Sequence, residues 1–297
     1  MTRSTLSLIA ASFKRFNEDK CWTSAIVISY FGLLCSVPVI ALFFSAAARL
    51  LGDTEVALRS LNIFTDEFFS RLEPGFFKGL GSLADGVGDL GLFGVIGSLV
   101  SASFLFSTLV TTINQIFRTK YHRSFVYNRL IEFLMMFVVG IFMFFSLAMT
   151  AVWTGLGRTI QASELVRTTL NPEAVAVINN FFLKYLLPYV LDVAMFYILY
   201  KYIPETKVHT RAGLVPAAVA ALLFEVFKRA FAFYVVHFSA VGIVLSKILQ
   251  GTLTSVLFFL LWITSSLVIM LWGAELAAVL NEHYDAAAAA KTAGAAK

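Results

Sequence analysis

Long runs of apolar residues, separated by short polar links, dominate the hydrophobic pattern of this chain. A helix that crosses the hydrocarbon core of a bilayer needs ~20 predominantly apolar residues. Six stretches meet this requirement, and none alternates in the manner of a strand, so the pattern predicts an all-α polytopic membrane protein with about six transmembrane helices. The predicted spans cover residues 22–51, 90–117, 130–156, 178–203, 212–238 and 253–280.

Two segments outside the spans have amphipathic helical spacing. Residues 1–20 are predicted to form an interfacial helix on the cytoplasmic face, and the first outer loop is predicted to hold a second amphipathic helix. The apolar positions are Leu6, Ile9, Phe13 and Phe16 in the first segment and Ala57, Leu61, Phe64, Phe68 and Leu72 in the second. A six-helix transmembrane domain over residues 21–284 and an alanine-rich disordered tail over 285–297 complete the predicted organisation.

Composition agrees with a membrane protein. Hydrophobic residues make up 59% of the 297 and charged residues 14%, against roughly 25% charged residues in a typical soluble domain. The net charge of +5 is typical of cytoplasmic loops that face anionic lipid and does not indicate nucleic-acid binding. The two cysteines, Cys21 and Cys35, fall about 20 Å apart on one predicted helix and cannot pair with each other.

Basic residues gather in alternate links between the spans. Eleven lie in the N-terminal segment, the second link and the fourth link: Arg3, Lys14, Arg15, Lys20, Arg118, Lys120, Arg123, Arg129, Lys201, Lys207 and Arg211. The links on the other side carry fewer, and acidic residues outnumber the basic ones in the long first loop. Because basic loops stay in the cytoplasm, both ends of the chain are predicted to be cytoplasmic.

Charged residues inside the fifth predicted span are the sharpest candidate site. Glu225, Lys228 and Arg229 are spaced by three and four residues, so the carboxylate and both cations share a helical face. The fourth span offers Asp192, four residues after Pro188, where a proline is expected to kink the helix. Charges at this depth are costly when they face lipid, so this face is expected to point into the bundle.

Two interpretations of the charged residues remain open. In the first, they bind a substrate or coupling ion near the membrane midplane, and the protein transports an amphiphilic or small ionic substrate. In the second, they form a structural salt-bridge network in a non-transporting envelope scaffold or assembly factor. The sequence carries no nucleotide-binding motif, so transport would be passive, ion-coupled or dependent on a partner. Membrane lipids are the expected partners, and the oligomeric state is left open.

Other polar residues are weaker candidates. Glu275 lies near the end of the last span, and Asn114 and Tyr234 lie in the second and fifth spans. Hydroxyl residues also make the second span unusually polar, which indicates close helix packing or, as a second interpretation, the lining of a pathway. These hydroxyl residues include Ser101, Ser107, Thr108, Thr111 and Thr112.

Signatures of enzymes are missing from the sequence. Residues 86–91 match GxGxxG but precede a membrane helix rather than join a strand to a helix. The four histidines are scattered and show no metal-ligand spacing. No catalytic residue, metal site or cofactor is predicted, and nucleic-acid binding is not expected.

Local patterns along the chain resemble those of the YihY/BrkB family of bacterial inner-membrane proteins. They run in family order from the first predicted span to the last: Tyr30, Leu34, Ser36 and Pro38; Asn114, Arg118 and Arg123; Tyr200, Ile203 and Pro204; Arg211, Gly213, Phe231 and Tyr234; Gly242; Trp262 and Gly273-Ala274-Glu275-Leu276. The chain departs from the family pattern at Val241, where a tyrosine is usual.

The resemblance implies six membrane helices in the bacterial inner membrane with both ends in the cytoplasm. Members of the family have been labelled virulence factors, transporters and a tRNA-processing ribonuclease. The ribonuclease label finds no metal ligands or general base among these residues, so no enzyme activity is expected.

Overall fold

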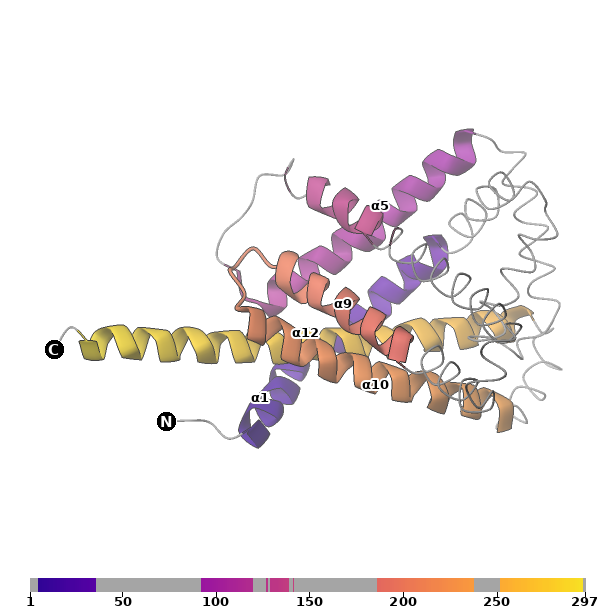
Figure 1. Ribbon diagram of the computed structural model, residues 1–297. Helices are drawn as coiled ribbons and strands as arrows, with labels where there is room; N and C mark the ends of the chain where they lie inside the picture. Colours follow the sequence, from indigo (N-terminus) through magenta and orange to yellow (C-terminus); the bar gives the residue numbers. More distant parts are fainter. Residues whose placement is uncertain are drawn as a thin grey trace, which may run out of the picture.

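The computed structural model describes residues 5–35, 92–119, 127, 129–138, 141, 186–237 and 252–295. Across these ranges the secondary structure is helical, and no strand occurs in them. The labelled helices in Figure 1 are α1 (Thr5–Glu18), α5 (Leu92–Ile116), α9 (Leu187–Tyr202), α10 (Thr210–His237) and α12 (Thr252–Ala295). A further apolar helix, Cys21–Cys35, follows α1 directly.

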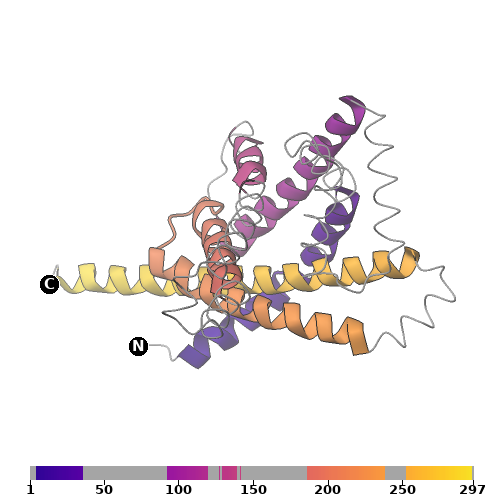
Figure 2. The same cartoon turned by 45° about the vertical axis from the view of Figure 1, so that its right-hand side comes forward.

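Helices α9, α10 and α12 form the best packed part of the protein. In Figures 1 and 2, α10 and α12 lie side by side, and α9 packs against α10. Small side chains allow this close approach, as is common between membrane helices. The small residues at this junction that are buried are Ala217, Ala220 and Ala221 on α10 and Ala274, Ala277 and Ala278 on α12.

Helix α1 crosses the long helix α12 and packs against it (Figure 1). Its buried positions include Ser12 and Phe16, whereas Phe13 is 56% exposed and lies 5.1 Å from the Trp272 ring between centroids. The apolar face predicted for an interfacial helix is therefore divided between α12 and the surroundings. Arg15 donates to both carboxylate oxygens of Glu282, at 2.8 and 2.5 Å, and ties α1 to α12.

The helix boundaries agree with the predicted spans where the structure describes them. Helix α5 begins and ends within two residues of the second predicted span, and α10 does so for the fifth. Within the part of the chain that the structure describes, two helices, Thr210–Tyr234 and Val256–Ala290, are long and apolar enough to cross a membrane. Only parts of the first, third and fourth predicted spans lie within the described residues, and the amphipathic helix of the first outer loop lies outside them.

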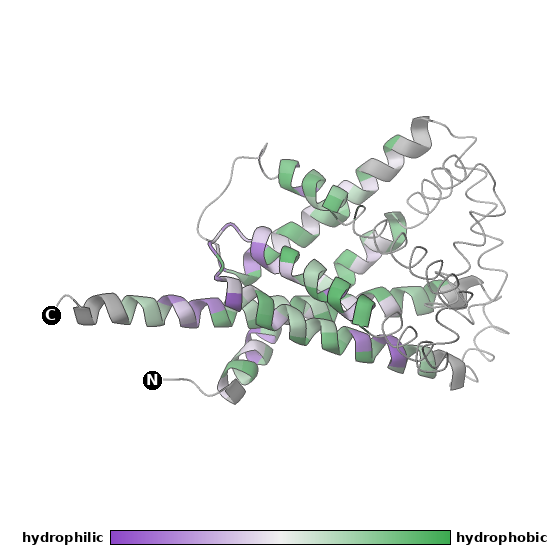
Figure 3. Ribbon diagram, in the orientation of Figure 1, coloured by the Kyte–Doolittle hydropathy of each residue, from purple (hydrophilic) through white to green (hydrophobic). Residues whose placement is uncertain are grey.

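Large apolar side chains cover the outside of these helices. Phe137, Leu222 and Val226 are each more than half exposed. In Figure 3 most of the coloured residues of α10 and of the first half of α12 are green, which marks them as hydrophobic. An apolar exterior of this extent is unusual for a soluble protein, and lipid contact accounts for it. The described part of the chain is thus an all-helical protein with a membrane-compatible exterior.

The prediction of a disordered tail over residues 285–297 differs from the structure. Helix α12 continues without a break through Ala295 and extends beyond the other helices (Figure 1). The physical reason is composition, since alanine has the highest intrinsic helix propensity and a helix that is already nucleated extends readily. The low complexity of the tail therefore marks an exposed helical extension.

Candidate intramembrane charge site

The charged residues of α10 interrupt an otherwise apolar helix. Figure 3 shows this interruption as purple in the second half of α10. Glu225, Lys228 and Arg229 stand at the predicted spacing, and both cations pair with the carboxylate, Lys228 at 2.5 Å and Arg229 at 3.7 Å. The helical period alone brings these three groups together.

Asp192 on α9 completes the site, as the sequence predicts. Its Oδ2 accepts a hydrogen bond from the ammonium group of Lys228 at 3.0 Å. Lys228 therefore bridges two carboxylates on two helices, one 36 residues away in the chain. The charge site is defined here as Asp192, Glu225, Lys228 and Arg229, whose formal charges cancel.

Burial divides the charge site into two parts. The side chains of Lys228, Glu225 and Asp192 are 15%, 11% and 21% exposed, whereas that of Arg229 is 52% exposed. The buried part alone carries one cation and two anions. Arg229 restores neutrality from the edge of the site, where its side chain is half exposed.

Aromatic rings separate the charge site from α12. The ammonium nitrogen of Lys228 lies 5.0 Å from the centroid of the Phe224 ring, a cation–π distance. Trp262 of α12 stacks against Phe227 at 5.1 Å and lies 5.0 Å from the centroid of Phe231. Phe224 was not singled out from the sequence, so its contact with the ammonium group was missed.

Pro188 lies in the first turn of the described helix α9, which begins at Leu187. Leu186 already has helical backbone angles, φ −76° and ψ −48°, so helical backbone reaches the edge of the described residues. The kink expected at this proline therefore stays a prediction, and Asp192 follows one turn later.

Glu275, a weaker candidate from the sequence, lies apart from the charge site. It is fully buried, and its Oε1 accepts a weak hydrogen bond from the Cys21 thiol at 3.5 Å. Its Oε2 and the Oδ2 of Asp19 are buried without a partner among the described residues. Glu275 thus anchors the beginning of the Cys21–Cys35 helix against α12. Asp19 was not predicted, because an acidic residue in a polar link carries no distinctive pattern.

Asn114 and Tyr234, the other two weaker candidates from the sequence, make separate contacts in different parts of the protein. The side-chain oxygen of Asn114 accepts a hydrogen bond from the backbone N–H of Glu205 at 3.0 Å. Tyr234 is 39% exposed and packs near Phe231 and Phe258. Asn114 therefore fastens the link between α9 and α10, which the sequence alone does not indicate.

A known family accounts for nearly the whole chain. The family model described as Virulence factor BrkB matches residues 12–297. The chain belongs to this family. Its Gly273-Ala274-Glu275 segment lies at the crossing of α12 with its neighbours, and its Asn114 lies at the end of α5.

Curated relatives of the chain are named UPF0761 membrane proteins. One from Pseudoalteromonas atlantica is 26% identical over 286 residues, which cover 92% of this chain and 87% of the relative. Another from Alcanivorax borkumensis is 30% identical over 278 residues, which cover 91% of this chain and 60% of the relative. No solved structure matches the chain. The names of the relatives and the apolar helices together support a membrane location.

Proposed function

We propose that this protein binds an anionic amphiphilic or small ionic substrate at the charge site and moves it across the bacterial inner membrane. The observation that carries the proposal is the unequal burial of the two cations. Lys228 is held by two carboxylates inside the bundle, while Arg229 is half exposed at the edge of the same site. A guanidinium in this position offers bidentate hydrogen bonds to a phosphate or carboxylate.

The carboxylates have a defined part in this proposal. Glu225 lies 3.7 Å from the Arg229 guanidinium, beyond hydrogen-bond distance, so the pair is loose. An anion that reaches Arg229 does not have to displace the shorter bonds of Lys228. The buried bridge between Asp192 and Lys228 keeps α9 and α10 in register while the ligand exchanges at Arg229.

A scaffold without transport is the second candidate, and one observation favours it. The bridge from Lys228 to Asp192 and Glu225 is buried and complete, as expected of charges that only specify helix packing. In the scaffold Arg229 only balances the charge of the site, whereas transport requires its guanidinium to bind the substrate. The two candidates therefore differ in what Arg229 does.

Flux through purified protein in liposomes tests the proposal. One probe is phosphatidylglycerol that carries a fluorescent label close to its headgroup, and its movement is followed by chemical quenching of the label from outside the liposomes. The other probe is chloride, whose efflux is measured. We expect wild-type protein to move at least one probe and Arg229→Ala to lower that flux at least tenfold. Arg211→Ala is the matched control, because Arg211 is an exposed arginine at the start of the same helix.

Folding is checked on the same samples by the melting temperature in detergent, followed through tryptophan fluorescence. A normal melting temperature with unchanged flux in Arg229→Ala would refute the assignment of the site. If wild-type protein moves neither probe, the transport proposal is rejected for both substrate classes and the scaffold is retained.

A further inference from the structure

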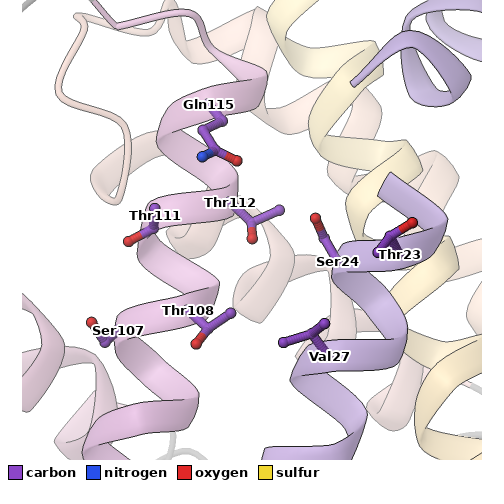
Figure 4. Close-up of a pocket in the computed structure, with 8 residues that line it drawn as sticks. All are labelled: Thr23, Ser24, Val27, Ser107, Thr108, Thr111, Thr112 and Gln115. Carbon is purple, nitrogen blue, oxygen red and sulfur yellow. The ribbon is translucent and has the colours of Figure 1, made fainter. Parts of the chain in front are cut away.

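A polar cavity lies between the Cys21–Cys35 helix and α5, apart from the charge site. Its volume is about 320 Å³, within the usual size of small-ligand pockets. Figure 4 shows that threonine and serine side chains from both helices line it, together with the Gln115 amide and Val27. Hydroxyl and amide groups from both helices thus open onto one pocket, where they can exchange hydrogen bonds with a polar occupant.

Thr112 points to a ligand more directly than the other lining residues do. Its side chain is 5% exposed and projects toward Ser24 on the facing helix (Figure 4). Neither hydroxyl has a hydrogen-bond partner within the described ranges, whereas the Thr108 hydroxyl donates to the Phe104 carbonyl oxygen at 2.9 Å. Close packing between hydroxyl helices does produce direct bonds elsewhere, as between Thr264 and Ser29 at 2.8 Å. The space between Thr112 and Ser24 is therefore suited to a polar group from outside the protein.

Two basic residues stand at the polar end of the cavity. Lys20 precedes the Cys21–Cys35 helix and Arg118 follows α5, and both have a positive φ, 51° and 49°. The carbonyl oxygen of Lys20 accepts from the N–H of Ser24 at 3.2 Å, and the N–H of Arg118 donates to the carbonyl oxygen of Gln115 at 2.9 Å. The backbone of each basic residue therefore lies within about one turn of a lining residue.

An acidic residue, Asp19, lies beside one of these cations. Asp19 Oδ1 lies 3.8 Å from an Arg118 nitrogen, too far for a hydrogen bond. The Arg118 side chain is 50% exposed and retains donors for an anion. The distribution of basic links places this end at the cytoplasmic surface, where phospholipid headgroups lie.

We propose that the cavity binds a phosphoglycerol group, supplied by an anionic phospholipid of the cytoplasmic leaflet. The phosphate lies toward Lys20 and Arg118, and the glycerol hydroxyls exchange hydrogen bonds with Thr112, Ser24 and the Gln115 amide, all of which donate and accept. An ethanolamine headgroup fits less well, since its ammonium group would approach the two cations. This binding is separate from the charge site and does not depend on transport.

Lipid retention measured by native mass spectrometry tests the proposal. Protein is released from nanodiscs that contain equal amounts of phosphatidylglycerol and phosphatidylethanolamine. The test variant is Ser24→Ala/Thr112→Val, which removes two hydroxyls with little change of shape. The control is Ser101→Ala, a hydroxyl removal on the same helix outside the cavity. We expect the test variant to lose about tenfold in phosphatidylglycerol affinity, and the control to match wild type.

Further variants test which residues cause the retention of phosphatidylglycerol. Lys20→Asn keeps a residue that tolerates a positive φ and should abolish the preference for phosphatidylglycerol over phosphatidylethanolamine. Arg211→Ala, at an exposed arginine that does not line the cavity, should retain the lipid as wild type does. If Ser24→Ala/Thr112→Val keeps the lipid and Arg229→Ala loses it, the retained lipid belongs to the charge site and the cavity proposal is overturned.

The source of the phosphoglycerol group is tested with soluble glycerol 1-phosphate, by calorimetry on detergent-solubilised protein. We expect soluble glycerol 1-phosphate to bind at least a hundredfold more weakly than the lipid, since it lacks the acyl chains. Equal affinity would assign the cavity to a water-soluble phosphate and overturn the lipid assignment. Equal lipid retention by wild type and Ser24→Ala/Thr112→Val, with unchanged melting temperatures, would refute the site.

Discussion

The Tyr200 hydroxyl donates a hydrogen bond of 2.8 Å to the backbone carbonyl oxygen of Met270. Tyr200 lies on α9 and is fully buried, so this bond joins α9 to α12 inside the bundle. The phenol reaches α12 because Gly273, three residues further along, has no side chain in the way. The glycine of the Gly-Ala-Glu segment therefore has a packing role, which sequence pattern alone leaves unexplained.

Gly273→Ala should destabilise the protein. A Cβ at this position would overlap with the Tyr200 hydroxyl and would lie 2.8 Å from the Cβ of Ala220. Both neighbours are fully buried and cannot move aside cheaply. We expect a loss of about 1–3 kcal/mol in the free energy of unfolding, typical of an overpacked core. Thermal unfolding in detergent, followed by tryptophan fluorescence, measures the change.

Gly97→Ala is the matched control for this prediction. Gly97 also lies within a helix, but a Cβ there would meet nothing within 4 Å. Because alanine favours the helix over glycine by up to about 1 kcal/mol, we expect unchanged or raised stability. Equal melting temperatures for the two variants would contradict the role assigned to Gly273.

Sequence periodicity predicts the parts of this protein that depend on local pattern. Helices α5 and α10 follow from apolar length, and the pairing of Glu225 with Lys228 follows from their spacing of three residues. Asp192 could be chosen as a partner because an unpaired carboxylate in an apolar span needs one. These inferences rest on geometry within one helix or on the large energetic cost of a charge that faces lipid.

Contacts between distant segments could not be predicted in the same way. The approach of Tyr200 to Met270 and the burial of Glu275 against Cys21 depend on how helices cross. Crossing positions arise from the fit of many small side chains and leave no periodic signal in one sequence. The length of α12 was underestimated for another reason, since low complexity and high helix propensity coincide in an alanine-rich segment.

Lys228→Met should be the most harmful change at the charge site. It leaves the Asp192 and Glu225 carboxylates, 21% and 11% exposed, without the ammonium group that bridges them. Loss of one partner from a buried ion pair costs about 3–5 kcal/mol. Thermal unfolding in detergent measures the loss. Lys207→Met, at an exposed residue of the link after α9, is the control and should change the free energy of unfolding by less than about 0.5 kcal/mol.

A double substitution tests whether the loss comes from the bridge itself. Asp192→Asn removes one of the two carboxylates that Lys228 neutralises, so Asp192→Asn/Lys228→Met should be less destabilised than the sum of the single variants. We expect a coupling of at least about 1 kcal/mol. Strict additivity would mean that the Asp192–Lys228 contact contributes nothing.

Asn281→Ala should loosen the link between α9 and α10. The Asn281 side chain accepts from the N–H of His209 at 2.9 Å and donates to the carbonyl oxygen of Lys207 at 3.3 Å. Asn281 is 6% exposed, so its removal leaves two backbone groups with one partner fewer, at a cost of about 1–3 kcal/mol. Hydrogen exchange should become faster in the peptide that contains His209 and stay unchanged in α5.

Asn114→Ala tests the contact that α5 makes with the same link between α9 and α10. The bond from the Glu205 N–H to the Asn114 side chain, 3.0 Å long, is then lost. Exchange at Glu205 should become faster while His209 remains protected by Asn281. If both variants expose the whole link equally, the two asparagines do not fasten separate points of it.

The ion pair between Arg15 and Glu282 should hold α1 on α12. Both bonds run between the guanidinium and the two carboxylate oxygens, and they raise the pKa of Arg15 above its ordinary value. The Glu282 side chain is half exposed, so the contribution to stability is modest, about 1 kcal/mol. Arg15→Glu should accelerate hydrogen exchange in α1, because two carboxylates then face each other. Arg15→Glu/Glu282→Arg should restore slow exchange, and failure of this rescue would show that the apolar contact of Phe16, not the ion pair, positions α1.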